Sequence, residues 1–265
     1  NPAELAGEEG TVLELKVKKG KDGKVQDYKI TRAKYSNVRP ETLTWVNSTT
    51  AMLKVPTFDV GYNRKRVEDL MTEAGKAKNL ILDLRSNPGG AVINLTHLMG
   101  LLLPEGTPIG TFISRSTVSR FVKERGGSPT DLVAIAHWSP MKLKAQKNEV
   151  PVFKGNVAVL INGGSGSASE IAAAALKESL NAPLIGTKSA GAVLVSVMAP
   201  MPHGYMLQYP ITDYITMQGL RLEGNGVQPV VEAPAAVRFG EPDVAVEKAV
   251  ILLQRAELRQ GRDGK

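Results

Sequence analysis

The sequence predicts an α/β fold, and three observations lead to this prediction. Short apolar runs of strand length, such as 79–84 and 157–161, each lead through a glycine-containing turn into a segment of helix length. Hydrophobic residues make up 42% of the 265 residues, enough to fill a sizeable core. No apolar run approaches the ~20 residues that cross a bilayer. We therefore expect repeated strand-turn-helix units around a buried sheet.

The first 37 residues have a different pattern. Residues 10–17 and 28–31 alternate apolar and polar side chains on either side of a charged turn at 18–24, which predicts a β-hairpin. A lone hairpin buries too little surface to be stable. We expect it to be either part of a larger β domain or a two-stranded edge added to the main sheet.

The middle of the chain alternates helix and strand. Residues 64–77 and 91–103 are expected to form helices that flank the strand 79–84. Residues 106–150 follow as a long, uneven connection with seven basic and three acidic residues. Because such loops are usually functional or disordered, this segment is either a lid over the site or a surface insertion.

The sequence GSGSASE at 164–170 lies between the strand 157–161 and an alanine-rich helix. A side chain at the start of a helix faces outward, and the free N–H groups of the first turn can receive an oxyanion. Ser167 is therefore the candidate nucleophile, with Ala168 N–H as a donor. The pair Ser167 and Glu170 also fits a capping box, and the two roles can coexist.

A second motif, LILDLRSNPGG at 80–90, takes a buried parallel-type strand into a turn with two glycines. Gly89 and Gly90 would let a backbone N–H approach a substrate oxygen closely. An ordinary strand-to-helix turn would have the same sequence. We predict that the two motifs form one site, and the sequence does not choose between the two glycines.

Beyond the serine helix, the pattern predicts strands at 184–187, 193–199, 206–210 and 211–217 and an amphipathic closing helix at 244–259. The absence of cysteine excludes structural disulfides, thiol catalysis and cysteine zinc sites. The net charge of +7 is spread along the chain without interleaved aromatic residues, which argues against nucleic-acid binding.

With these motifs the sequence resembles the S41 peptidases, the tail-specific or C-terminal processing proteases, over roughly residues 50–235. A third element, LEGNGVQP at 222–229, is similar to a late motif of that family, with Val230 where aspartate is usual. The resemblance implies the spiral α/β core shared by Clp-type peptidases and crotonases over residues 38–265. It also implies that residues 1–37 are the C-terminal part of a PDZ-like domain.

The chain departs from the processing proteases at the general base. Those enzymes have a lysine twenty-five residues after the serine, and here that position is Ala192. A methyl group cannot accept a proton, so this Ser/Lys dyad is missing. The nearby Lys188 is expected to be a solvated turn residue. Either Ala192 is an engineered replacement, or the chain resembles the lysine-free, tricorn-like branch, which we favour.

That branch implies a serine, a histidine and a glutamate, and the glutamate would be Glu223. Three histidines in the chain could serve as the base. His97 lies in an apolar helix, where a structural role fits better; His137, in the long connection, is the strongest of the three; His203 lies in a turn between strands. None is convincing, and the resemblance places the catalytic histidine in a segment N-terminal to this chain.

The resemblance implies a serine endopeptidase that acts on peptides or proteins, including C-terminal tails, without a cofactor or metal. It also implies a location in the cell envelope, the periplasm or outside the cell, and it is compatible with a homo-oligomer. The alternative is a peptidase fold that has lost its base and binds peptides as a scaffold. A crotonase-like enzyme of CoA thioesters is disfavoured, because it would need no outward serine at a helix start.

Overall fold

The computed structural model describes residues 5, 7–18, 20, 23–33, 39–234 and 241–263. The chain divides into two compact units, Asn1–Arg39 and Pro40–Lys265. The expected boundary at 37/38 lies outside the described residues. In the first unit, β1 (Val12–Lys18) and β2 (Val25–Thr31) pair antiparallel, as the alternation predicts. They form a two-stranded sheet of their own.

The second unit is built on a six-stranded sheet in the order β12-β9-β8-β5-β4-β3. All neighbours in it are parallel except β3 and β4. Its strands are β3 (Thr42–Trp45), β4 (Thr50–Lys54), β5 (Asn79–Asp83), β8 (Asn156–Ile161), β9 (Leu184–Gly186) and β12 (Val231–Glu232).

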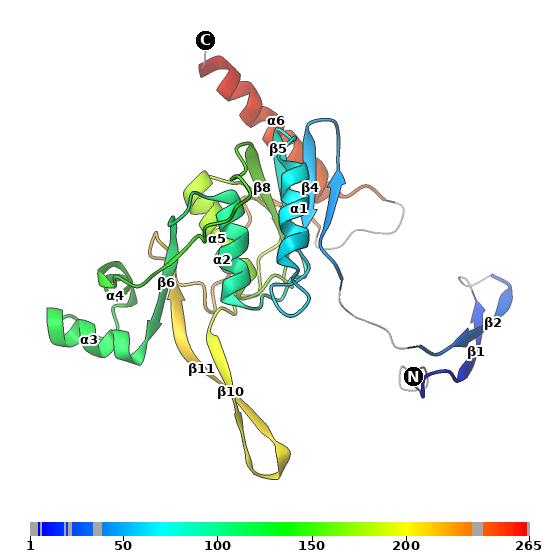
Figure 1. The fold of residues 1–265 in the computed structure, drawn as a ribbon, viewed down its shortest axis with the longest axis horizontal. Coiled ribbons are helices and arrows are strands. Elements are labelled where there is room, and N and C mark those ends of the chain that lie inside the picture. The colour runs from blue at the N-terminus through cyan, green and yellow to red at the C-terminus, as the bar shows by residue number, and fades with distance from the viewer. Residues whose placement is uncertain are drawn as a thin grey trace. The chain divides into compact units, whose positions relative to one another are not determined.

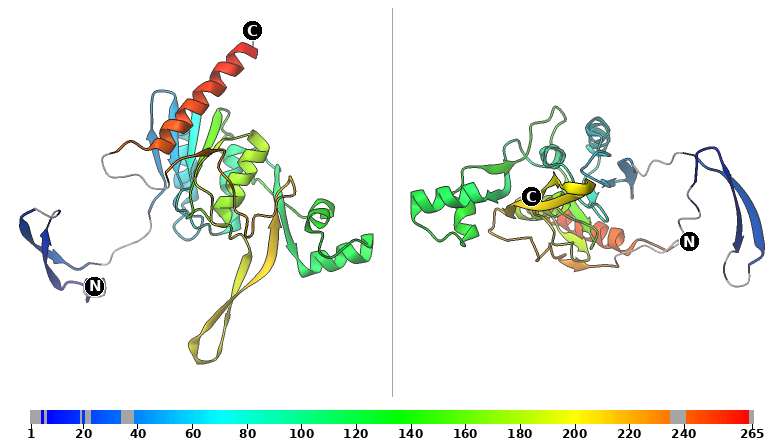
Figure 2. Two further views of the ribbon diagram at one scale, coloured as in Figure 1. Left: turned by 180° about the vertical axis from the view of Figure 1, so that it is seen from behind. Right: turned by 90° about the horizontal axis from the view of Figure 1, so that it is seen from below.

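Helices cover both faces of this sheet (Figures 1 and 2). They are α1 (Arg64–Ala74), α2 (Val92–Leu102) and α5 (Ala168–Leu180) on one face and α6 (Val244–Asp263) on the other. Because side chains alternate along a strand, Leu80 and Leu82 pack with the first group, whereas Ile81 packs with α6. Burial on both faces explains why β5 is a continuous apolar run.

A second sheet, in the order β10-β11-β6-β7, forms one side of the unit. It contains β6 (Pro108–Ser114), β7 (Lys142–Lys144), β10 (Val195–Pro200) and β11 (Met206–Ile215). A 3₁₀ turn, η2 (Pro202–Gly204), joins β10 and β11 into a long hairpin that extends away from the body of the unit (Figure 1). The two strands predicted at 206–210 and 211–217 are thus one strand, since Pro210 lacks an N–H but sits where the ladder does not require one.

The prediction of an irregular connection at 106–150 is wrong. This segment contributes β6, β7, α3 (Arg115–Arg125) and α4 (Leu132–Trp138). Both helices are short: α3 is mostly polar, whereas the seven residues of α4 are apolar except for His137. Only a few side chains such as Phe121 and Ile135 are buried between them and the sheet. Their apolar periodicity is therefore weak in the sequence. No helix within the described residues has the length and hydrophobicity needed to cross a membrane.

Candidate active site

Ser167 lies at the turn from β8 into α5, as its N-cap residue. Its backbone has φ 50° and ψ −117°, a conformation that L-residues rarely adopt and that typically costs about 1–3 kcal/mol. Two hydrogen bonds hold it, because the Ser167 N–H lies 2.9 Å from the Ala192 carbonyl oxygen and 3.1 Å from Glu170 Oε2. The predicted capping-box arrangement with Glu170 is also present. The capping role predicted for this turn is thus observed, and the role of Ser167 as a nucleophile stays a prediction.

The other two serines of the motif fasten it to the second motif. Ser165 and Ser169 are fully buried, and their hydroxyls donate to the carbonyl oxygens of Leu84 (2.8 Å) and Asn87 (2.9 Å). The Gly166 N–H also donates to Asn87 O at 3.0 Å. The structure thus brings the two predicted motifs together, and among the three serines it leaves Ser167 to face a cleft.

Glu170 organises the loop opposite Ser167. Its carboxylate is fully buried and accepts four hydrogen bonds. Besides the Ser167 N–H, the donors are Ser189 Oγ (2.5 Å) and the N–H groups of Gly191 (2.7 Å) and Ala192 (2.9 Å). A buried carboxylate with four donors is well compensated for its lost hydration. Glu170 therefore fixes the loop 189–192 beside the nucleophile.

The backbone of Ala192 is consequently adjacent to Ser167. Its carbonyl oxygen and N–H are both used in the bonds described above, and its methyl group is exposed. The position at which the resemblance places a lysine is thus next to the serine, but its side chain can take no proton. Lys188 is exposed and extends beside Gly226, so it lies where a solvated turn lysine was expected.

The two glycines of the second motif differ in their hydrogen bonds. The Gly89 N–H donates to Asn87 Oδ1 at 2.9 Å, whereas the Gly90 N–H has no partner within the described residues. The Ala168 N–H, at the first position of α5, is also unpartnered in that part of the chain. Gly89 packs directly against Ser167, since a Cβ on Gly89 would lie 2.7 Å from Ser167 Cβ. Of the two glycine N–H groups, that of Gly90 is therefore the one left without a partner among the described residues.

Ser167 opens into a cleft of about 350 Å³. Its walls come from several elements, and they include Asp59, Gly90, Leu95, Phe112, Ala168, Ile171, Val193, Leu194, Ser196 and Gln208. The apolar side chains come mainly from α2, α5 and β6, and the polar ones from the β10–β11 hairpin and the loop after β4. Such a mixed lining suits a substrate that has both a polar backbone and apolar side chains.

Glu223 binds the backbone of the same cleft wall. Its Oε2 accepts from the N–H groups of Val193 (2.8 Å) and Leu194 (3.2 Å). Within the described residues, no histidine hydrogen-bonds to Glu223 or to Ser167. The structure therefore puts Glu223 at the cleft, as a residue that positions the loop 193–194.

The three histidines lie apart from Ser167 in their contacts. His137 is exposed on α4, and His203 is exposed at the end of the β10–β11 hairpin. His97 is buried in α2, where Nδ1 lies 2.8 Å from the Tyr62 hydroxyl and Nε2 lies 3.2 Å from Glu68 Oε1. Burial lowers the pKa of His97, although the neighbouring Glu68 opposes the shift. His97 is thus a structural histidine, as its apolar helix predicts.

Sequence reasoning missed several residues of this site. The sequence motif shows Asn87 only as part of a turn, yet its side chain accepts from the Gly89 N–H and donates to the Val55 carbonyl oxygen at 2.8 Å. An asparagine two residues before a glycine is a weak signal for such a turn. Phe112 and Gln208 carry no local signal, because the second sheet alone brings them to the cleft.

Comparison with known proteins agrees with this geometry. The family model described as peptidase family S41 matches residues 49–233. A carboxy-terminal-processing protease of Bartonella bacilliformis is 32% identical over 173 residues, which are 64% of this chain and 35% of that protein. The chain thus spans about a third of the length of this curated relative.

Two solved structures share the fold. The photosystem II D1 C-terminal processing protease matches with a TM-score of 0.60 at 20% identity, over 93% of this chain and 61% of that one. The tricorn protease matches with a TM-score of 0.59 at 18% identity, over 93% of this chain and 22% of that one. These matches support the mixed α/β fold with a parallel sheet. Because the family model covers most of the residues, including both motifs and the Glu223 loop, the chain belongs to peptidase family S41, a family of serine-type peptidases.

Proposed function

We propose that this chain is the proteolytic core of a serine endopeptidase that cleaves peptide or protein substrates, with Ser167 as its nucleophile. The observation that carries the proposal is the arrangement at the turn. A strained serine faces a cleft, and the same cleft is lined by Ala168 and Gly90, whose N–H groups have no partner among the described residues. Such donors receive the oxyanion of a tetrahedral intermediate, and each is typically worth about 3 kcal/mol of transition-state stabilisation.

The edge strand β10 supports a peptide as the substrate. In the β10–β11 ladder Ser196 faces Pro210, which has no N–H, so this pair is not hydrogen-bonded. Hydrogen-bonded pairs alternate in an antiparallel ladder, so Ser196 and Met198 direct their backbone N–H and C=O groups away from β11. This free edge begins at the cleft, because Ser196 lines it. An extended peptide can therefore pair with β10 and bring a carbonyl carbon to Ser167.

The proposal also requires a general base that accepts the proton of the Ser167 hydroxyl. Residue 192 cannot supply it, and within the described residues Ser167 has no histidine or lysine as a hydrogen-bond partner. We favour a histidine from outside this chain, oriented by Glu223. Ala192 also supports a second candidate function, a peptide-binding protein that has kept the cleft without catalysis.

Labelling with a fluorophosphonate probe separates these readings. Labelling of this chain that disappears in Ser167→Ala would establish an activated serine without lysine. Labelling only of a chain extended at its N-terminus would assign the base to the added segment. Labelling only of Ala192→Lys would identify a disabled Ser/Lys enzyme, because the backbone of residue 192 is adjacent to Ser167. Silence in all forms would favour the binding protein.

Two further parts of the proposal come from the resemblance. The succession of β5, α2, β8 and α5 supports a spiral core of the Clp and crotonase type. A location in the cell envelope or outside the cell, and a PDZ-like origin of the hairpin β1–β2, remain proposals. Fractionation of cells that express the complete protein tests the first.

A further inference from the structure

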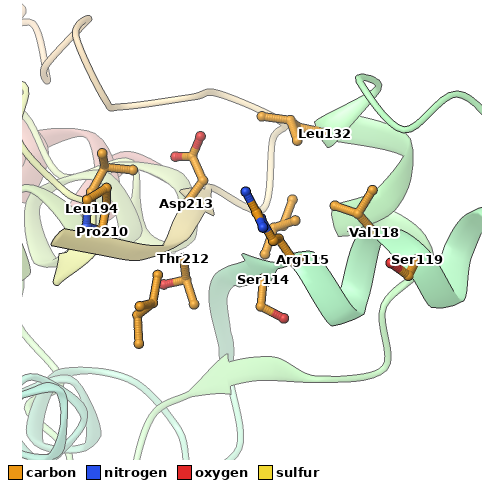
Figure 3. Close-up of a pocket in the computed structure, with 11 residues that line it drawn as sticks. Ser114, Arg115, Val118, Ser119, Leu132, Leu194, Pro210, Thr212 and Asp213 are labelled. Atoms are coloured by element: carbon orange, nitrogen blue, oxygen red, sulfur yellow. The ribbon is translucent and has the colours of Figure 1, made fainter. Parts of the chain in front are cut away.

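A second hollow of about 410 Å³ lies beside the cleft, between β6, α3, α4 and β11 (Figure 3). We call it the α3 groove. Its apolar lining consists of Ile113, Val118, Leu132, Leu194, Pro210 and Ile211. Leu194 also lines the Ser167 cleft, so the two hollows share one wall. Glu223 holds the backbone of this shared wall.

Two charged side chains, Arg115 and Asp213, line the same groove (Figure 3). Asp213 is already satisfied, because Oδ2 pairs with Arg221 Nε at 2.6 Å and Oδ1 accepts the Tyr214 N–H. Arg115 is exposed and has no acidic partner among the described residues. The groove therefore combines an apolar floor with one unmatched guanidinium group.

The other basic side chains of α3 do not play this role. Arg120 pairs with Glu124 at 3.7 Å and lies over the Trp138 ring at 4.9 Å. Lys123 and Arg125 are exposed on the same helix but do not line the groove. Arg115 is thus the cation that a ligand in the α3 groove would meet.

We infer that the α3 groove is a specificity site for the substrate peptide, and that it takes an acidic residue flanked by an apolar one. This inference rests on the proposed function. The apolar side chain would pack on Ile211 and Leu132, and the carboxylate would bind the Arg115 guanidinium, which matches a carboxylate in a two-pronged geometry. The shared wall at Leu194 makes the groove continuous with the cleft, so one extended peptide can occupy both.

A binding experiment tests this without requiring catalysis. The 265-residue chain with Ser167→Ala is titrated against two fluorescein-labelled decapeptides, one with Leu-Glu-Leu at its centre and one with Leu-Gln-Leu, and the anisotropy is followed. We expect the glutamate peptide to bind about tenfold more tightly, as one charge-assisted hydrogen-bonded pair would give. Arg115→Gln should abolish the difference, and Arg115→Glu should shift the preference to a Leu-Lys-Leu peptide.

The matched control is Lys123→Gln, which removes the same charge from α3 outside the groove. It should leave the tenfold preference unchanged, and the melting temperatures of all variants should agree. Equal affinity of the unmutated groove for both peptides would overturn the inference, as would an equal loss in Lys123→Gln, which indicates general attraction only. A change of sedimentation mass in Arg115→Glu with unchanged peptide affinity would also overturn it, since the groove would then join two copies. Fluorophosphonate labelling of Ser167 does not depend on any of these outcomes.

Discussion

The two sides of the candidate site differ in whether their hydrogen-bonding groups have partners within the described residues. On the Glu170 side, a buried carboxylate accepts four hydrogen bonds and fixes the loop 189–192. On the Gly90 side, two backbone donors, Gly90 and Ala168, face the cleft without a partner among the described residues. Ala168 is buried, where N–H groups are almost always paired, whereas Gly90 is exposed. The Glu170 side is thus fixed by hydrogen bonds, and under the proposed function the Gly90 side would receive the oxyanion of the substrate.

The largest expected effect on the labelling of Ser167 comes from Gly90→Ala, which would displace the unpartnered N–H of the Gly90 side. Gly90 has φ +139°, and a Cβ there would lie 2.3 Å from the backbone of Phe58 and Asp59. Because the backbone must shift, the N–H would leave its position. We expect the fluorophosphonate labelling rate, in whichever form of the chain labels, to fall by about a hundredfold or more.

The control for strain alone is Gly106→Ala. Gly106 also has a positive φ, +77°, but nothing lies within 4 Å of the added Cβ. We expect about 1 kcal/mol of destabilisation and an unchanged labelling rate. Gly90→Ala with a normal labelling rate would remove Gly90 from the oxyanion site.

Glu170→Gln, the next largest effect, breaks the anchored side. The amide keeps the shape of the side chain. However, its NH₂ group replaces one carboxylate oxygen and so faces N–H groups that have no acceptor there. We expect a loss of about 2–3 kcal/mol in the free energy of unfolding, measured by urea denaturation, and slower labelling of Ser167. Glu105→Gln, at an exposed site, should change stability by less than about 0.5 kcal/mol. Equal stabilities of the two variants would contradict the anchoring role.

The same comparison shows what the sequence could predict. Ser167 and the two glycines belong to local motifs, and local turn chemistry is visible in a sequence. Which of the two glycine N–H groups has a partner was not predictable, because this depends on the Asn87 side chain folding back onto the Gly89 N–H. The sequence also did not predict Phe112 and Gln208 as residues of the cleft wall, because pairing between strands far apart in the chain brings them to the cleft. The sequence did not predict the short helices α3 and α4, because neither has a strong apolar periodicity.

A smaller effect comes from His97, which extends the comparison to a network outside the site. Burial holds the pKa of His97 below its ordinary value, so the folded protein binds this proton less readily than the unfolded chain. The neutral, buried His97 therefore contributes to the stability of the folded protein above the pKa of the unfolded chain, about 6.5. That contribution is lost as the pH falls through the lower pKa of the folded protein. Urea denaturation between pH 7.5 and 5 should show it, and His97→Gln should flatten that slope. A slope unchanged in His97→Gln would mean that other groups cause it.

The smallest effect concerns the anchored end of the second motif. Arg85 binds both Asp83 and Asp243 through paired hydrogen bonds of 2.8–3.0 Å, and so joins β5 to the start of α6. Burial alone would raise the pKa of Asp243, but the Arg85 hydrogen bonds and charge, with the N–H groups of Val246 and Ala245, hold it below its usual value.

The stabilising contribution of Asp243 is therefore present above the unfolded pKa of about 3.9 and is lost as the pH falls through the lower folded pKa. At pH 7 we expect Asp243→Asn to lower the free energy of unfolding by about 1 kcal/mol, since the pair is partly exposed. The difference from the unmutated chain should shrink below pH 4 in urea denaturation, while labelling of Ser167 at pH 7 stays unchanged. A difference that persists at pH 3 would show that Asp243 acts through packing. A change in labelling would show that the anchored and open ends of the motif, Arg85 and Gly90, are coupled.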